Sequence, residues 1–207
     1  MKGKFTWILL FGMLVLVVGC GRDGKESDEL LDAFLAGEIP AFYGDTGESS
    51  FVCDNTMELE HIKDNAYDLV YTSNGTLSWI DDLTGMYQNI NRVLKNAGYS
   101  FMYDVHPFNR PFSGEAWNEP KIIKSYHDVM PDIHWRVQDI VNANIMVGLS
   151  INGLAELPAV DASFWFRHDE LIKKSQDELV NINDWTKNPM SALPAWMVLV
   201  SKKVSVE

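Results

Sequence analysis

Basic residues are scarce in this sequence, and the shortage narrows the range of partners. The 207 residues include 17 Lys and Arg but 29 Asp and Glu, so the formal net charge at pH 7 is -12. Nucleic-acid binding depends on cationic side chains that neutralise phosphates, and an acidic chain repels a phosphate backbone. We therefore expect a small-molecule or protein partner and no nucleic acid.

Cysteine is also scarce. Cys20 and Cys53 are the only two, and neither stands in a CxxC or other metal-binding spacing. The five histidines lack the close spacing of metal ligands as well. The sequence therefore predicts no disulfide framework and no metal site.

Aromatic side chains, in contrast, are plentiful, with 7 Trp, 7 Tyr and 10 Phe. They supply large apolar areas for a packed core, and a chain of this length can bury a sizeable one. We expect a single α/β domain over residues 25–207, preceded by an apolar segment over residues 1–24.

The apolar N-terminal segment is too short to cross a membrane comfortably. Residues 5–18 are almost wholly apolar, whereas a spanning helix needs about 20 apolar residues. A short basic stretch precedes them and Val17-Val18-Gly19-Cys20 ends them, which is the pattern of a bacterial lipoprotein signal. In this interpretation the protein is membrane-anchored through Cys20, and residues 21–29 form a polar tether.

A second interpretation places the same segment inside the fold. Residues 13–18 then form a buried parallel strand, because such strands are continuous apolar runs. Gly19, Gly21 and Gly24 follow directly, and glycines at a strand end let the backbone approach a ligand closely. In this case residues 13–24 are a first strand and a glycine-rich turn.

A strand, a helix and a second strand follow one another in the middle of the chain. Residues 67–72 are a β-branched and apolar run, and residues 73–75 are turn-forming. A helix is expected from residue 81 or 82 to residue 94, and residues 99–105 form the next strand. This order predicts a βαβ unit with two parallel strands.

The second half of the chain alternates between loops and regular elements. Residues 107–133 are rich in Pro, Gly and Asn and indicate an excursion or lid. A helix over residues 134–147 and a strand over residues 149–154 are expected next. A further helix is expected over residues 169–179, and residues 196–200 form a final strand that we place at the edge of the sheet.

The region before residue 54 has room for only one crossover. A helix is expected over residues 28–36, and short strands over residues 39–43 and 51–53. The turn between those strands is too short for the crossover that parallel neighbours need. The sheet is therefore expected to be incomplete on its N-terminal side.

Motifs in a fixed order resemble a known family. They are Phe51-Val52-Cys53-Asp54-Asn55, the strand and loop from Tyr67 to Trp79, the turn Leu94-Lys95-Asn96-Ala97-Gly98, and Tyr103-Asp104-Val105-His106-Pro107-Phe108. Their order and spacing resemble the class I S-adenosylmethionine-dependent methyltransferases, in a bacterial branch of small-molecule type. The resemblance implies a doubly wound, Rossmann-like α/β sheet with an antiparallel last strand, and S-adenosylmethionine across the carboxyl ends of the strands.

The resemblance also assigns roles to individual residues. The positions that contact the cofactor fall on Gly19, Gly21, Asp45, Asp54, Asn55, Ser73 and Asn74. Trp79 falls in the loop that lies beside the methyl acceptor. His106 follows the next strand and is the candidate catalytic base, because an imidazole titrates near neutral pH.

Several of these positions have a purely structural alternative. Asn55 can cap a strand end, since its side chain hydrogen-bonds to nearby backbone groups. Ser73 and Asn74 can simply form the turn after their strand. His106 can be a packed loop histidine, and Trp79 can be a core or lid aromatic.

The expected function is transfer of a methyl group from S-adenosylmethionine to a small-molecule acceptor. The protein is then cytoplasmic, with residues 13–24 as strand and turn. The alternative is a membrane-anchored lipoprotein whose methyltransferase-like domain binds without catalysis. The sequence leaves the methyl acceptor and the oligomeric state open.

The form of the N-terminus separates the two interpretations. If residues 13–24 belong to the fold, as the family resemblance favours, mass spectrometry of the protein made in a bacterium should show a start at Met1 or Lys2. A mature protein that begins at a lipid-modified Cys20 would instead support the lipoprotein.

Overall fold

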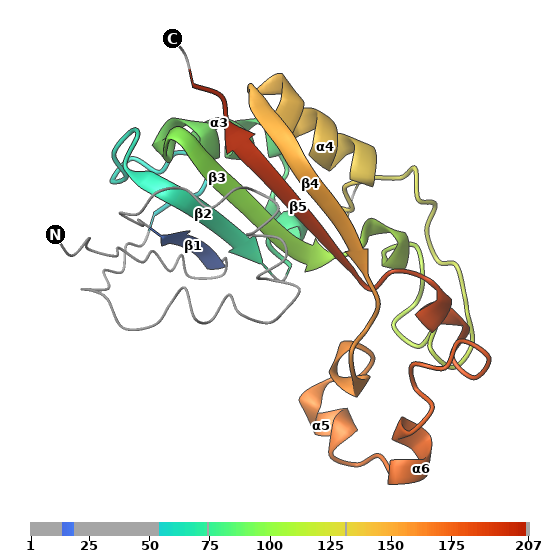
Figure 1. Cartoon of the computed structure of the whole chain (residues 1–207). Helices are drawn as coiled ribbons and strands as arrows, with labels where there is room; N and C mark the ends of the chain where they lie inside the picture. Colours follow the sequence, from blue (N-terminus) through green and yellow to red (C-terminus); the bar gives the residue numbers. More distant parts are fainter. Residues whose placement is uncertain (1–13, 19–53, 74, 131, 206–207) are drawn as a thin grey trace, which may run out of the picture.

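A five-stranded sheet forms the centre of the molecule. The structure, a computed structural model, describes residues 14–18, 54–73, 75–130 and 132–205, with side chains from residue 54 onward. Within these residues the strands lie in the order β1-β2-β3-β5-β4 (Figure 1). Their bounds are Leu14–Val18 for β1, Tyr67–Ser73 for β2, Leu94–Val105 for β3, Leu149–Leu157 for β4 and Trp196–Lys203 for β5.

Strands β2 and β3 are parallel and are joined by helix α3 (Leu83–Val93), which confirms the predicted βαβ unit. The helix begins where expected, because the side chain of Asp82 accepts a hydrogen bond from the Gly85 amide at 2.9 Å. Its last turn passes directly into β3. The pairing of β2 with β3 brings the ends of both strands, Ser73 and Val105, to one edge of the sheet.

Strand β5 is antiparallel to both of its neighbours, β3 and β4. The antiparallel closing strand is therefore confirmed, but its expected place at the sheet edge is wrong, because β5 lies inside the sheet and β4 lies outside it. The apolar run of β5 accounts for this, since Met197, Val198, Leu199 and Val200 are each at most 1% exposed. A strand buried on both faces is continuously apolar, whereas β4 alternates in exposure.

Three strands therefore end on the same side of the sheet. Strand β4 is antiparallel to β5, which is antiparallel to β3, so β4 runs in the direction of β2 and β3. We call the side where Ser73, Val105 and Leu157 end these strands the carboxyl edge.

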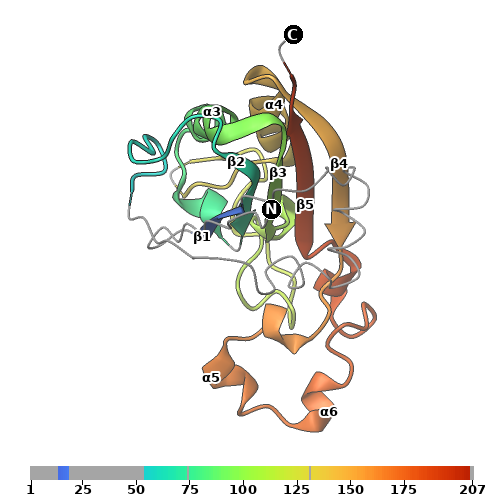
Figure 2. The same ribbon diagram turned by 60° about the vertical axis from the view of Figure 1, so that its left-hand side comes forward.

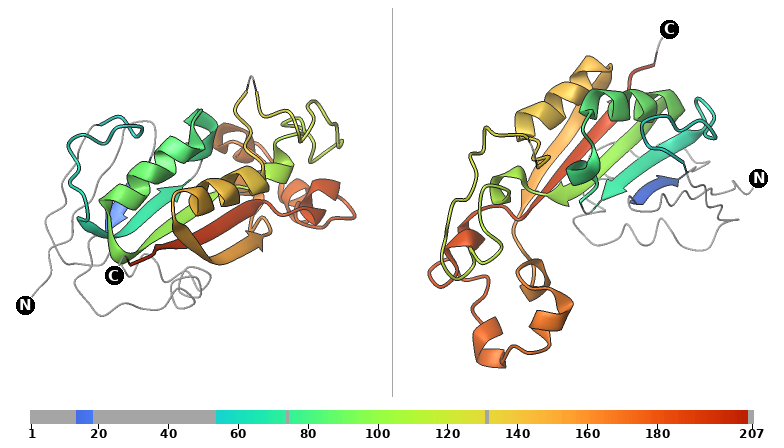
Figure 3. Two further views of the ribbon diagram at one scale, coloured as in Figure 1. Left: turned by 90° about the horizontal axis from the view of Figure 1, so that it is seen from above. Right: turned by 180° about the vertical axis from the view of Figure 1, so that it is seen from behind.

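Helices α3 and α4 (Val137–Met146) lie side by side on one face of the sheet (Figure 3). The main core fills the space between them and the strands, with Val70, Met86, Ile90, Met102 and Ile140 each at most 2% exposed. The other face carries a smaller cluster around Phe101 and Val198.

Two excursions leave the carboxyl edge. Residues 107–133 contain a short 3₁₀ helix, Pro107–Asn109, and an isolated bridge between Phe112 and Ile122. The second excursion, residues 158–194, holds α5 and α6 and extends away from the sheet (Figure 2). The remaining short elements are α5 (His168–Leu171), α6 (Gln176–Leu179) and the 3₁₀ helices Thr76–Trp79, Ala162–Phe164 and Pro189–Ala192.

The single helix expected over residues 169–179 is divided into α5 and α6. Ser175 causes the division, because its hydroxyl accepts from the Glu178 amide at 3.3 Å while the Glu178 carboxylate accepts from the Ser175 amide at 2.8 Å. This reciprocal pair is a capping box, which begins a new helix and ends continuity with the previous one.

Strand β1 pairs with β2, so the segment belongs to the sheet, as the second interpretation of the N-terminus requires. Its direction differs from the expectation, because β1 is antiparallel to β2, with Leu14 opposite Ser73 and Val18 opposite Leu69. An apolar run marks a buried strand but does not encode its direction. The helix and strands expected over residues 28–53 lie outside the described residues, and no described helix is long and apolar enough to cross a membrane.

Gly98 lies close to backbone atoms of neighbouring segments, so a larger residue there should destabilise the fold. A Cβ at this position would lie 2.9 Å from the Lys95 carbonyl oxygen and 3.1 Å from that of Asp68, both backbone atoms that cannot move aside easily. Gly98→Ala should therefore lower the free energy of unfolding by about 1–3 kcal/mol in urea titrations. Gly114→Ala is the matched control, because a Cβ there meets nothing within 4 Å and should change stability by less than about 0.5 kcal/mol. Equal effects of the two substitutions would contradict the packing argument.

Candidate functional site at the carboxyl edge

The loop after β2 is held by a carboxylate from β3. Asp104 is 1% exposed, and its side chain accepts hydrogen bonds from the amides of Gly75 at 2.9 Å and Leu77 at 3.1 Å. It also accepts from the Val105 amide at 2.7 Å, and the Arg110 guanidinium lies 3.6 Å away. One buried carboxylate thus joins the ends of the two parallel strands.

The same loop is fixed by further bonds. Gly75 has φ of 86°, a left-handed conformation that favours glycine, and the Thr76 hydroxyl donates to the Ser73 carbonyl at 2.9 Å. At the far end of the loop, the Trp135 indole donates to the Ile80 carbonyl at 2.7 Å. Between these anchors Trp79 is 74% exposed. The loop therefore presents a large aromatic side chain to solvent from a rigid base.

His106 lies directly after β3 and is fully buried. Its Nδ1 accepts from the Phe108 amide at 3.2 Å, so the ring proton is on Nε2, which donates to Glu156 at 2.8 Å. Burial lowers the pKa of His106 below its ordinary value, and the nearby Glu156 carboxylate opposes this shift without reversing it. The ring is therefore neutral at pH 7 with both nitrogens occupied.

These bonds bear on the expected role of His106 as a base. To accept a proton from a methyl acceptor, the ring would have to give up the Phe108 amide or the Glu156 carboxylate. The arrangement instead resembles a fixed hydrogen-bond bridge between β3 and β4, which favours the structural alternative. The role of catalytic base stays a prediction that this geometry does not favour.

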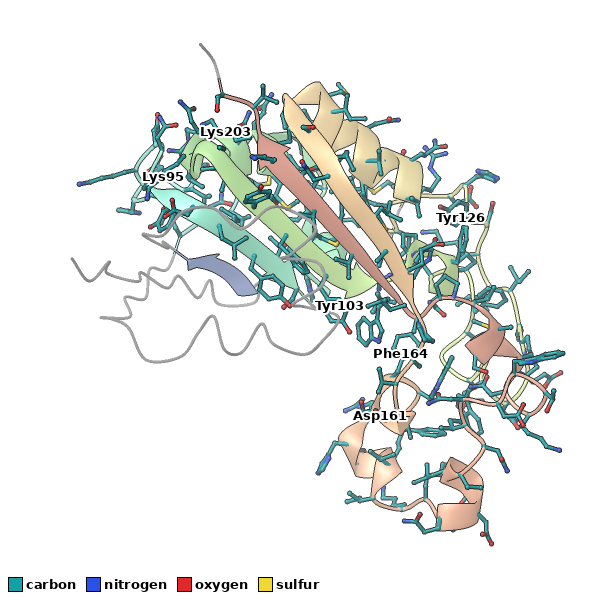
Figure 4. All side chains as sticks on the ribbon, in the orientation of Figure 1. Lys95, Tyr103, Tyr126, Asp161, Phe164 and Lys203 are labelled. Carbon is teal, nitrogen blue, oxygen red and sulfur yellow. The ribbon has the colours of Figure 1, made fainter. Side chains whose placement is uncertain are left out.

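Aromatic rings line the second face of the sheet at the carboxyl edge. Tyr103 stacks on Trp196 with ring centroids 4.8 Å apart, and Phe164 meets Trp196 edge-on at 5.0 Å. Figure 4 shows Tyr103 and Phe164 together at this end of the strands, far from Lys95 and Lys203 at the other end. Burial, together with Tyr71, raises the pKa of Tyr103 to about 12, so its hydroxyl stays protonated.

Asp54 and Asn55 form a turn in the segment before β2. The Asp54 carboxylate accepts from the amides of Asn55 and His61, both at 2.8 Å, and from the His61 ring at 3.1 Å. These bonds, the His61 amide foremost, hold the pKa of Asp54 below its usual value. The exposed Asn55 side chain accepts from the Met57 amide at 3.0 Å. Both side chains are thus hydrogen-bonded within their own segment, and a contact of either with the cofactor stays a prediction.

The structure brings together only part of the expected site. Ser73 is buried at the end of β2, opposite Tyr103 in the register, and His106 follows β3 at the same edge. Gly19, Gly21, Asp45 and Asn74 lie outside the described residues.

Four residues of this edge were not singled out from the sequence, namely Asp104, Arg110, Trp135 and Glu156. The sequence does contain a signal for Asp104, because a carboxylate within an apolar strand needs hydrogen-bond donors when it is buried. Glu156 and Trp135 had none, since their partners are 50 and 55 residues away along the chain.

Solved structures share this fold. An S-adenosylmethionine-dependent methyltransferase from Mesorhizobium loti matches with a TM-score of 0.52 and 16% identity, over 82% of this chain and 75% of its own. A protein from Listeria monocytogenes assigned to the same enzyme class matches with a TM-score of 0.52 and 14% identity, over 99% and 93%. The cyclase SpnF matches with a TM-score of 0.50 and 16% identity, over 100% and 78%.

A sequence comparison gives a match to part of the chain. The family model of a methyltransferase domain matches residues 16–102, which include β1, β2, α3 and most of β3. Residues 16–102 thus resemble a methyltransferase domain, and the fold is that of S-adenosylmethionine-dependent methyltransferases. The comparison with curated proteins gives no match. The fold class is thereby confirmed, with a mixed sheet of Rossmann-like type.

The described residues bring together one half of the site that the family resemblance predicts. The loop after β2 and the end of β3 meet at the carboxyl edge through Asp104. The glycine-turn half is not matched in the same way, because β1 ends at Val18, opposite Leu69 and away from the carboxyl edge. Among the described residues no group of three or more His, Cys, Asp or Glu could hold a metal ion.

The burial of His106 predicts a pH dependence of stability. Because folding lowers this pKa, the unfolded chain binds the proton more readily, and stability is lost as the pH falls below about 6.5 toward the folded pKa. Thermal unfolding at pH 7.5 and 5.5 should therefore show a smaller acid-induced loss in His106→Gln than in the wild type. His127→Gln, at an exposed histidine, should leave the loss as in the wild type. An identical loss in wild type and His106→Gln would refute the argument.

Proposed function

We propose that this protein transfers a methyl group from S-adenosylmethionine to a small-molecule acceptor. The observation that carries the proposal is the loop after β2 at the carboxyl edge, whose residues Gly75 to Ile80 are held by Asp104 and Trp135. In the family this loop lies beside the sulfonium and the acceptor. The match of residues 16–102 to a methyltransferase domain supports the same function.

Methyl transfer requires little from the protein beyond aligning the acceptor with the sulfonium and excluding water from the site. S-adenosylmethionine supplies a methyl group activated by its sulfonium charge. The protein contributes by holding the acceptor in line and by excluding water, and both depend on a loop of fixed geometry. Ser73 and Asn74 are the proposed contacts to the cofactor, and the exposed Trp79 is the proposed contact to the acceptor.

The two excursions support a small acceptor. They meet where Trp117 packs edge-on against Phe166, with ring centroids 4.7 Å apart, and the Lys174 ammonium lies 4.9 Å from both rings. Cation–π contacts of this kind tie separate segments together. Both excursions start from the carboxyl edge and contact each other, and we propose that they enclose a small acceptor.

A second candidate is a binding domain without catalysis. The antiparallel direction of β1 favours it, because a glycine turn after β1 would begin at the side of the sheet opposite Ser73. Such a domain would keep the acceptor half of the site while lacking a cradle for the methionine part. Its membrane-anchored form depends on Cys20, which lies outside the described residues.

Calorimetry with S-adenosylhomocysteine distinguishes the two candidates. The methyltransferase should give saturable heat with a Kd of roughly 1 μM to 1 mM, the range of ordinary enzyme substrates. Absence of heat at millimolar ligand in a folded sample would reject methyl transfer and leave the binding domain.

Two serine variants locate the binding. Ser73→Ala should weaken the affinity for S-adenosylhomocysteine by about threefold to tenfold, in line with one lost hydrogen bond. Ser100→Ala is the matched control, because Ser100 is also buried but lies away from the carboxyl edge, opposite Val70. Ser100→Ala should leave the affinity for S-adenosylhomocysteine unchanged. Equal losses of affinity in the two variants would show that the ligand does not bind beside Ser73.

A further inference from the structure

Asp104 is an unusual residue for the interior of this sheet. It stands between Met102 and His106 on the face covered by α3 and α4, and 1% of its surface is exposed. Burying a carboxylate is costly, and an apolar side chain of similar size is often at least as stabilising in such a place. A role in stability alone therefore does not account for it.

The bonds of Asp104 point to the loop after β2. Oδ1 accepts from the amides of Gly75 and Val105, and Oδ2 accepts from the amide of Leu77. The Gly75 and Leu77 amides lie beyond the end of β2, so the sheet cannot supply acceptors for them. Both oxygens of the carboxylate are needed, because its two loop bonds use different oxygens.

Arg110 extends this connection to the first excursion. Its guanidinium lies 3.6 Å from Oδ1 of Asp104, and the residue directly follows the 3₁₀ helix after β3. Opposite charges at this distance attract strongly where water is excluded. The loop after β2, the end of β3 and the start of the excursion are thereby tied to one carboxylate.

We propose that Asp104 is a positioning residue, which sets the loop residues Gly75 to Trp79 at the geometry that binds the cofactor's reacting end. The inference rests on the proposed methyl transfer and adds a residue that touches neither cofactor nor acceptor. It acts on the loop through the Gly75 and Leu77 amides.

Asp104→Asn tests the proposal, because an amide has one acceptor oxygen and presents donors where the carboxylate has a second acceptor. Hydrogen exchange by NMR should show the Gly75 and Leu77 amides exchanging at least tenfold faster than in the wild type, relative to amides of β5. Calorimetry should show at least a tenfold weaker affinity for S-adenosylhomocysteine. Both are measured on folded samples of the full chain.

Ser201→Ala is the matched control for a purely structural effect. It removes a buried hydrogen bond from the Ser201 hydroxyl to Asn144, at 2.8 Å, on the same face but away from the loop. It should change the exchange at Gly75 and Leu77 and the affinity by less than twofold. If it reproduces the effects of Asp104→Asn, the positioning role is overturned.

Gly75→Ala keeps the proposal testable where Asp104→Asn does not fold. A Cβ at Gly75 meets nothing within 4 Å, but the residue has φ of 86°, so alanine strains the loop without a clash. It should weaken S-adenosylhomocysteine binding at least fivefold, and unchanged affinity would overturn the proposal.

Hydrogen exchange and calorimetry together separate the failure of this inference from the failure of the proposed function. Unchanged exchange at Gly75 and Leu77 in Asp104→Asn overturns the inference even when the wild type binds the ligand. Faster exchange with unchanged affinity overturns it too, because the loop geometry then does not matter for binding. A wild type without affinity for S-adenosylhomocysteine instead removes the proposed function.

Discussion

The parallel pairing of β2 with β3 is the constraint on which the rest of the structure depends. It is made by the helix between them, and it brings Ser73 and Val105 to one side of the sheet. Only there can a carboxylate at Asp104 reach backbone amides of a loop 27 and 29 residues earlier in the chain. A slip of one residue in the register would turn Asp104 to the opposite face, and the loop would lose its anchor.

Hydrogen bonds between buried polar groups connect the elements that meet at the carboxyl edge. Asp104 joins β3 to the loop after β2, and the buried His106 joins β3 to β4 through Glu156. Trp135 joins the same loop to the segment before α4. A buried polar network rigidifies a structure when each member is satisfied. At this edge the buried hydroxyls of Thr72 and Ser78 have no hydrogen-bond partner, so the network is satisfied only in part.

Local patterns predicted the elements of this fold well, and long-range arrangement was predicted less well. The βαβ unit followed from runs and caps within about 40 residues, such as Asp82 at the start of α3. The place of β5 inside the sheet did not follow, although Met197 to Val200 form the continuous apolar run of an interior strand. For the site, Ser73 and His106 were recognised because they follow strands, whereas Glu156 is paired through a contact that leaves no local trace.

A shared fold does not by itself assign an activity, and the relatives illustrate this because a cyclase matches alongside methyltransferases. What bears on activity here is that the two halves of the site have separate origins. The proposed acceptor half is held by hydrogen bonds among residues 75 to 156, and none of these bonds involves β1. A ligand that contacts mainly this half can bind regardless of which residues hold the nucleoside. Methyl transfer, in contrast, needs both halves at once.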